Sequence, residues 1–168
     1  IAADNICGGN SRFHGSQGSS VLKLFGLTAA STGINEKAAQ AAGIAYDKVV
    51  LFPASHATYY PGAQSMAMKG LYEKESLRLL GAQIVGGDGV DKRIDVLATA
   101  IRAKMTALEL TELDLSYAPP YSSAKDPVNM AGFMIEDLES EKVRQFHWNE
   151  VEDLPCDGSA TLLDVRTA

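Results

Sequence analysis

The amino-acid sequence predicts an α+β fold in which helices pack on an antiparallel sheet. The predicted order is strands, a short helix, a strand, a hairpin and then helices, which is not the strict alternation of a parallel α/β sheet. Several strand-like runs lie close together in the chain, as hairpin partners do. The 168 residues, 46% hydrophobic and 21% charged, suffice for one domain with a single core plus a tail.

The first twenty residues are expected to hold the end of a helix and a connector. Ile1–Ile6 has the pattern of the last turns of a helix, and Gly8 and Gly9 stop it. The following stretch, Asn10–Ser20, is rich in glycine, serine and glutamine, which is typical of a connector between domains.

The predicted sheet begins after this connector. Val21–Phe25 and Leu27–Ser31 have strand patterns, with a break or bulge expected at Gly26. A short helix over Asn35–Ala42 follows, capped by the asparagine side chain. Further strands are expected over Asp47–Phe52, Met66–Tyr72 and Leu77–Val85, the last two joined as a hairpin.

The second half of the domain is predicted to be helical. Val90–Met105 is the clearest helix, because apolar residues recur at spacings of three and four and form one stripe. Thr106–Glu109 has a capping-box pattern and should begin a short helix. Tyr117–Lys125 contains two adjacent prolines and must be irregular. Asp126 and Pro127 then fit the cap and first position of a helix that runs to about residue 138.

After residue 139 the composition changes. Glu139–Lys142 is a charged linker, Trp148–Leu154 is a predicted short helix, and Leu162–Val165 is a predicted strand. A lone strand cannot build a core, so the tail is expected to be the start of a second, truncated domain that packs poorly. The predicted divisions are residues 1–12, 13–139 and 140–168.

Composition excludes several classes of function. A net charge of −6 and a pI of about 5.0 argue against a nucleic-acid partner, and no run of roughly 18 apolar residues predicts a membrane span. Cys7 and Cys156 form no C-x-x-C pair, a disulfide between them stays open, and low cysteine usage fits a reducing cytoplasm. The histidines His14, His56 and His147 have no metal-ligand spacing, so no metal is expected and each is assigned to the surface or a loop.

Two proline-stiffened loops carry the most notable residues. They contain Tyr59–Pro61 and Tyr117–Tyr121, and functional residues often lie on loops held by a rigid scaffold. Packing of tyrosine against proline is the simpler interpretation of both. Lys92–Arg93 and Lys125 lie near them, and a solvated or salt-bridged surface role is the default for such residues. Gly86–Gly89 lacks the spacing of a nucleotide-binding turn and is interpreted as structural.

Three segments resemble one known family. Ser55–Ala63, Gly89–Val96 and Tyr117–Gly132 are similar to segments of the coenzyme A-disulfide reductases, in the same order. The resemblance implies the C-terminal dimerisation domain of a pyridine nucleotide-disulfide oxidoreductase. Ile1–Gly8 resembles the helix after the last FAD-binding segment, and Leu162–Thr167 resembles the first strand of a rhodanese domain.

The resemblance implies an FAD- and NAD(P)H-dependent homodimer that reduces coenzyme A disulfide. In such an enzyme the interface loops complete the partner subunit's active site. It implies catalytic roles for Tyr117 and Tyr59 as neutral hydrogen-bond donors to the departing thiolate or the active cysteine. Both hydroxyls should then lie close together at one end of the domain, facing the dimer interface. Substrate contacts fall to Tyr121, Tyr60, Lys125 and Arg93, and an exchange of roles within either tyrosine pair stays open.

The family's nucleotide fingerprints and its active-site cysteine do not match any segment of this sequence. Neither Cys7 nor Cys156 has the required context, so the chain alone is expected to hold no cofactor and to be inert. Three alternatives remain open: a persulfide or polysulfide reductase, an NADH oxidase or peroxidase of the same family, and a dimeric scaffold without chemistry.

Overall fold

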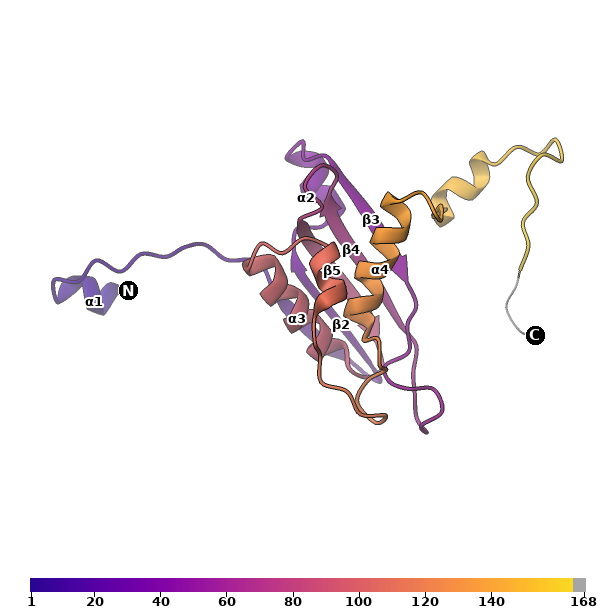
Figure 1. Ribbon diagram of the computed structural model, residues 1–168. Helices are drawn as coiled ribbons and strands as arrows, with labels where there is room; N and C mark the ends of the chain where they lie inside the picture. The colour runs from indigo at the N-terminus through magenta and orange to yellow at the C-terminus, as the bar shows by residue number, and fades with distance from the viewer. Residues whose placement is uncertain (165–168) are drawn as a thin grey trace.

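A five-stranded antiparallel sheet is the centre of the computed structural model, which describes residues 1–164 (Figure 1). The strands lie in the order β1-β2-β5-β4-β3, and every neighbouring pair is antiparallel. Their bounds are β1 Ser20–Leu24, β2 Leu27–Gly33, β3 Tyr46–Leu51, β4 Met66–Glu73 and β5 Leu79–Gly86. The predicted α+β class with an antiparallel sheet is confirmed.

The two hairpins differ in detail from expectation. Leu24 pairs with Leu27, so Phe25 and Gly26 form a two-residue turn between β1 and β2, where the sequence predicted a broken or bulged strand. Phe25 has a φ of 52°, the positive value that tight hairpin turns require. Leu77 also has a positive φ, of 57°, which keeps it in the turn and delays the start of β5 to Leu79.

Helices cover one face of the sheet. α3 spans Val90–Arg102, α4 spans Pro127–Glu139, and a 3-10 helix, η1, spans Leu108–Glu112. In Figure 1, α3 and α4 lie side by side over the strands. Their apolar faces and the covered face of the sheet share one core that includes Met66, Met68, Tyr72, Ile84, Val90, Ile94, Leu97, Leu110, Val128 and Ile135.

The predicted caps are present. The side chain of Asn35 accepts a hydrogen bond from the Ala38 amide at the start of α2, Glu36–Ala41. Asp126 caps α4, with Asn129 completing a capping box. The capping-box pattern at residue 106 opens the short 3-10 helix η1. α3 ends at Arg102, before the expected Met105, because the chain turns there with Lys104 at a φ of 62°.

The two ends of the described part of the chain, residues 1–164, lie outside the core (Figure 1). The short helices α1, Ala2–Ile6, and η2, Trp148–Asp153, bury none of their residues. Residues 161–164 form no strand, so the predicted strand over Leu162–Val165 is wrong for its described part. Val165 lies outside the described residues. One contact ties the linker down: the side-chain amide of Gln145 donates to the Val50 carbonyl at 2.6 Å and accepts from its N–H at 3.1 Å.

A charged cluster at the start of α2 should make the free energy of unfolding fall as the solution becomes acidic. The Glu36 carboxylate lies 2.8 Å from Lys48 Nζ and also pairs with Lys69. Partial burial acts to raise the pKa of Glu36, but the two lysines outweigh it and lower that pKa to about 2. A lowered pKa means that this stabilisation is complete above the ordinary glutamate pKa and is lost as pH falls to about 2.

Glu36→Gln should therefore lower the free energy of unfolding at pH 7, with a difference from the parent chain that narrows below pH 4.5. Urea unfolding followed at a series of pH values measures this difference. Glu75→Gln, on the exposed turn between β4 and β5, is the matched control. A difference that stays constant down to pH 2 would contradict the ion-pair explanation.

Candidate functional site

The two tyrosine loops meet at one end of the sheet. One loop joins β3 to β4 and carries Tyr59; the other joins η1 to α4 and carries Tyr117. The hydroxyl oxygens of Tyr59 and Tyr117 lie 2.8 Å apart and share a hydrogen bond, although the two residues are 58 positions apart in the chain. The expected closeness of these hydroxyls is confirmed by this distance.

The geometry of the pair leaves one hydroxyl hydrogen free. Each phenol carries a single hydrogen, so when one hydroxyl donates to the other, the second still has its own hydrogen for a third group. The hydrogen bond with Tyr59 raises the pKa of Tyr117 above its ordinary value, so the Tyr117 phenol is neutral at pH 7. Tyr59 is 75% exposed and Tyr117 48%, so this donor faces outward, toward whatever covers the loops.

The other two loop tyrosines do not join this pair. Tyr121 is largely exposed, and Tyr60 packs edge-on against the ring of His56, with ring centroids 5.9 Å apart. His56 is buried within its loop and its Nδ1 lies 3.1 Å from the hydroxyl of Ser55. His56 therefore supports the loop from inside rather than lying on the surface.

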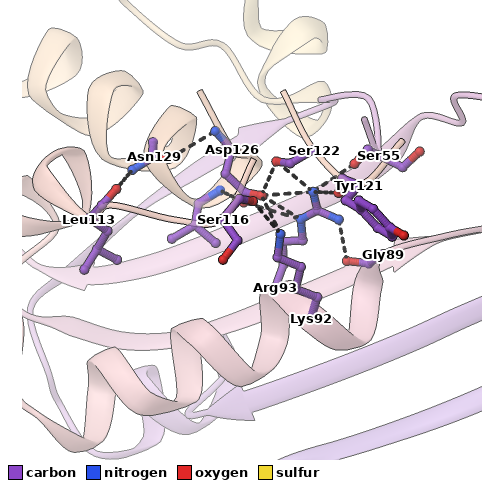
Figure 2. A network of polar contacts seen from close by, with 11 residues as sticks. Ser55, Gly89, Lys92, Arg93, Leu113, Ser116, Tyr121, Ser122, Asp126 and Asn129 are labelled. Carbon is purple, nitrogen blue, oxygen red and sulfur yellow. Dashed lines mark hydrogen bonds and ion pairs between the residues drawn. The ribbon is translucent and has the colours of Figure 1, made fainter. Parts of the chain in front are cut away.

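A buried ion pair lies directly beneath the loops (Figure 2). Arg93 is 1% exposed and Asp126 is 2% exposed, and their side chains approach to 2.9 Å. The Arg93 guanidinium also donates to three main-chain carbonyls, those of Ser55 at 2.8 Å, Gly89 at 3.1 Å and Tyr121 at 3.3 Å. The expectation that Arg93 lies on the surface is wrong, because Asp126 neutralises its charge inside the domain.

Asp126 stays ionised despite its burial. Burial acts to raise the pKa of this carboxyl, but hydrogen bonds from the Ser122 hydroxyl at 2.6 Å, from Arg93 and from the Val128 amide outweigh it and lower the pKa. From the sequence alone, Asp126 was assigned only the role of a helix cap. The available signal for a larger role was the place of Arg93 between Val90 and Ile94, on the buried face of α3.

A hollow of about 420 Å³ lies beside the tyrosine pair. It is bounded by the start of α3, with Asp88 and Lys92, and by the loop that carries Tyr117 and Tyr121. Lys92 lines the hollow, and its ammonium donates to the Ser116 carbonyl at 3.3 Å. Lys125 does not line this hollow; its ammonium lies 4.4 Å from the centroid of the Phe133 ring.

The glycine-rich turn before α3 is structural, as expected. Gly89 adopts a φ of 68°, and a Cβ there would lie 2.0 Å from Nη1 of Arg93. Glycine thus lets the backbone approach the buried guanidinium closely enough for its carbonyl to accept a hydrogen bond.

Other kinds of site find no support in residues 1–164. No group of three or more histidine, cysteine or acidic residues gathers there in a way that could hold a metal ion. Within the same part of the chain, none of the helices has the length and apolar character to cross a bilayer. Cys7 and Cys156 are both exposed free thiols, so the disulfide that the sequence left open does not form.

Comparison with known proteins gives one consistent result. A family model described as the pyridine nucleotide-disulphide oxidoreductase dimerisation domain matches residues 20–128. The coenzyme A disulfide reductase of Staphylococcus haemolyticus is 41% identical over 139 residues, which cover 82% of this chain and 31% of that protein. The chain thus spans about a third of the length of the curated relatives it matches.

Solved structures agree with these relatives. Reduced Bacillus anthracis CoADR-RHD superimposes with a TM-score of 0.84 at 48% identity, covering 90% of this chain and 27% of that one. A NAD-dependent persulfide reductase from A. fulgidus superimposes with a TM-score of 0.85 at 42% identity, covering 88% of this chain and 28% of that one.

Proposed function

Because the chain belongs to the pyridine nucleotide-disulphide oxidoreductase dimerisation domains, we propose that it serves an FAD- and NAD(P)H-dependent reductase of coenzyme A disulfide. The observation that carries this proposal is the hydrogen-bonded pair of Tyr59 and Tyr117 on exposed loops. In the whole enzyme, the flavin and nicotinamide supply the electrons and a cysteine outside this sequence attacks the substrate disulfide. This chain supplies the pair's free hydroxyl hydrogen to a partner subunit's site.

The proposed role of the tyrosines follows from simple chemistry. Attack by a thiolate on a disulfide releases a second thiolate, which carries a developing negative charge. A neutral phenol held at fixed geometry stabilises that charge by hydrogen bonding, without the cost of reorganising water. The proposed substrate contacts of Tyr121, Tyr60 and Lys125 would flank this donor.

The proposed homodimer needs a surface that a partner can cover. The tyrosine loops supply exposed aromatic residues, and the β1–β2 hairpin carries a run of exposed apolar side chains. Several exposed apolar side chains on one hairpin support an interface with another part of the protein or another subunit. The exposed hairpin residues are Val21, Leu22, Leu24, Phe25 and Leu27.

A persulfide reductase is the second candidate, because the A. fulgidus persulfide reductase matches this fold as well as CoADR-RHD does. The tyrosine pair would serve either reaction, since a thiolate or a hydrosulfide leaves in each. Comparing kcat/KM of the whole enzyme for coenzyme A disulfide and coenzyme A persulfide decides between them. The two free, exposed cysteines fit a reducing cytoplasm as the site of either activity.

Hybrid dimers test whether the tyrosines act across the interface. One subunit would carry Tyr59→Phe and Tyr117→Phe, and the other would lack the active-site cysteine. If the tyrosines serve the partner, the first subunit's cysteine still meets intact tyrosines, and we expect about half of the parent activity. If they serve their own subunit, neither site is complete and activity should fall to about half that of the doubly substituted homodimer, since only one cysteine remains.

The isolated chain provides the control for this proposal. We expect it to be colourless and to show no turnover with added FAD, NADH or NADPH and coenzyme A disulfide. Turnover of the isolated chain above that of buffer would contradict its expected inertness. A hybrid dimer without about half of the parent activity would contradict the proposal that the tyrosines act on the partner subunit's site.

A further inference from the structure

The Arg93 guanidinium connects the two tyrosine loops. One of its nitrogens, Nη2, donates to the Ser55 carbonyl at 2.8 Å, four residues before Tyr59 in the first loop. The same nitrogen lies 3.3 Å from the Tyr121 carbonyl and 3.3 Å from the Ser122 hydroxyl, both in the second loop (Figure 2). A single buried group thus holds main-chain atoms of both loops.

We infer that Arg93 is a positioning residue, which sets the separation of the Tyr59 and Tyr117 hydroxyls through the loops that carry them. This inference rests on the proposed function only for its effect on turnover. At 1% exposure Arg93 offers no surface to a substrate, so its effect acts through other residues.

A guanidinium suits this task better than an ammonium. Its donors lie in one plane and point in fixed directions, so it can hold several acceptors at set angles, whereas lysine presents one compact charge. All three nitrogens of the Arg93 guanidinium donate hydrogen bonds, since Nε also donates to both carboxylate oxygens of Asp126 and Nη1 donates to the Gly89 carbonyl. Asp126 in turn begins α4, so the second loop is fixed at its far end as well.

Other links between the loops are few. The Ala57 amide donates to the Ser122 carbonyl at 3.1 Å, and the tyrosine hydroxyls meet at 2.8 Å. The hydroxyl contact lies at the exposed tips of the loops, where water competes for it. The buried guanidinium is therefore the contact that can keep the two loop tips at a fixed separation before a partner or substrate binds.

Arg93→Lys tests this inference in the isolated chain. The substitution keeps the positive charge opposite Asp126 but loses the spread of donors. Carbon-13 labelling of the tyrosine rings allows Tyr117 to be titrated and its contact with Tyr59 to be followed by NMR. We expect the titration of Tyr117 to move back toward that of a free tyrosine, and the ring contact to weaken, while the chain stays folded.

Ser122→Ala is the second variant, in case Arg93→Lys does not fold. It removes the hydroxyl that bonds both Arg93 and Asp126 and leaves the ion pair in place. A smaller shift of Tyr117 in the same direction is expected. A Tyr117 titration and ring contact identical to those of the parent chain, in whichever of the two variants folds, would overturn the inference.

A double-substitution cycle in the whole enzyme links positioning to turnover. A misplacement of about 1 Å at a reacting centre can cost about a hundredfold in rate, so we expect Arg93→Lys to lower kcat by roughly tenfold to a hundredfold with a smaller change in KM. In a background of Tyr59→Phe and Tyr117→Phe this loss should largely disappear, because the hydroxyls to be positioned are gone. An equal loss in both backgrounds would mean that Arg93 acts on folding alone.

The NMR and kinetic measurements separate two kinds of failure. If the tyrosine substitutions leave turnover unchanged, the proposed function fails, yet the NMR result still decides whether Arg93 positions the pair. If Arg93→Lys leaves the pair unchanged, the positioning inference fails and the proposed function stands.

Discussion

Tyr117→Phe in the whole enzyme is expected to lower kcat by roughly tenfold to a thousandfold, as the loss of a transition-state donor does in other enzymes. The ring stays, so packing of the loop should be unchanged. What is lost is one of two hydroxyls that lie 2.8 Å apart, and with it the ordered donor that faces outward. Because this donor acts on charge that develops during reaction, KM should change much less than kcat.

Tyr59→Phe should show a loss of similar size, and the double variant should lose less than the product of the two. Two hydroxyls that share one hydrogen bond act as a unit, and residues that act as a unit are not additive. Tyr46→Phe is the matched control, because Tyr46 lies at the far end of β3 and its hydroxyl contacts Gln40 and Glu36. Steady-state kinetics on variants with intact flavin content and dimerisation provide the measurement.

The opposite result has a clear meaning. If Tyr117→Phe and Tyr59→Phe both retain parent turnover, the pair only joins two loops and the thiolate is stabilised elsewhere. A loss in Tyr46→Phe as large as in Tyr117→Phe would instead indicate a general effect of tyrosine loss on stability.

The elements that the sequence predicted well are those set by near neighbours in the chain. The caps at Asn35 and Asp126 depend on residues two or three positions away, and the apolar spacing of α3 lies within one helix. The hairpin turn at Phe25 and Gly26 was expected only as a break or bulge in strand, because a non-glycine residue with positive φ is rare and the local pattern gives little warning of it.

Long-range pairing could not be predicted in the same way. β2 pairs with β5, so Ser31 meets Gln83, and nothing in the local pattern of either strand specifies this partner. The tyrosine pair was expected only because its two loops resemble those of a known family. Spacing alone gave no reason to place residues 58 positions apart within hydrogen-bonding distance.

Arg93 shows why a buried charge is difficult to predict. A lone charge is costly to bury, so an arginine is assigned to the surface unless a partner is known. Its partner, Asp126, is 33 positions away and already had a role as a cap. Only the folded chain shows that one carboxylate serves both purposes.

Asp126→Ala is expected to lower the free energy of unfolding by about 3–5 kcal/mol, because it leaves a buried guanidinium without its counter-charge. Arg93 is 1% exposed and cannot turn to water without moving both tyrosine loops. The loss of the α4 cap, worth about 1 kcal/mol, is part of this cost. Asp126→Asn keeps one oxygen for the Val128 amide but loses the charge and the second oxygen that accepts from Arg93 and Ser122, so it should fall between the parent and the alanine variant.

Urea unfolding of the chain at pH 7 measures these differences, and Asp137→Ala is the matched control. Asp137 pairs with Lys142 at 3.3 Å, but both side chains are well exposed, so its removal should cost less than about 1 kcal/mol. The Asp126 effect also has a defined pH dependence. Since the pKa of Asp126 is lowered in the folded chain, its stabilisation is complete above the ordinary aspartate value of 3.8 and is lost as pH falls through the lowered value. An Asp126→Ala chain as stable as Asp137→Ala would show that Arg93 finds another partner, and that the ion pair does not hold the loops together.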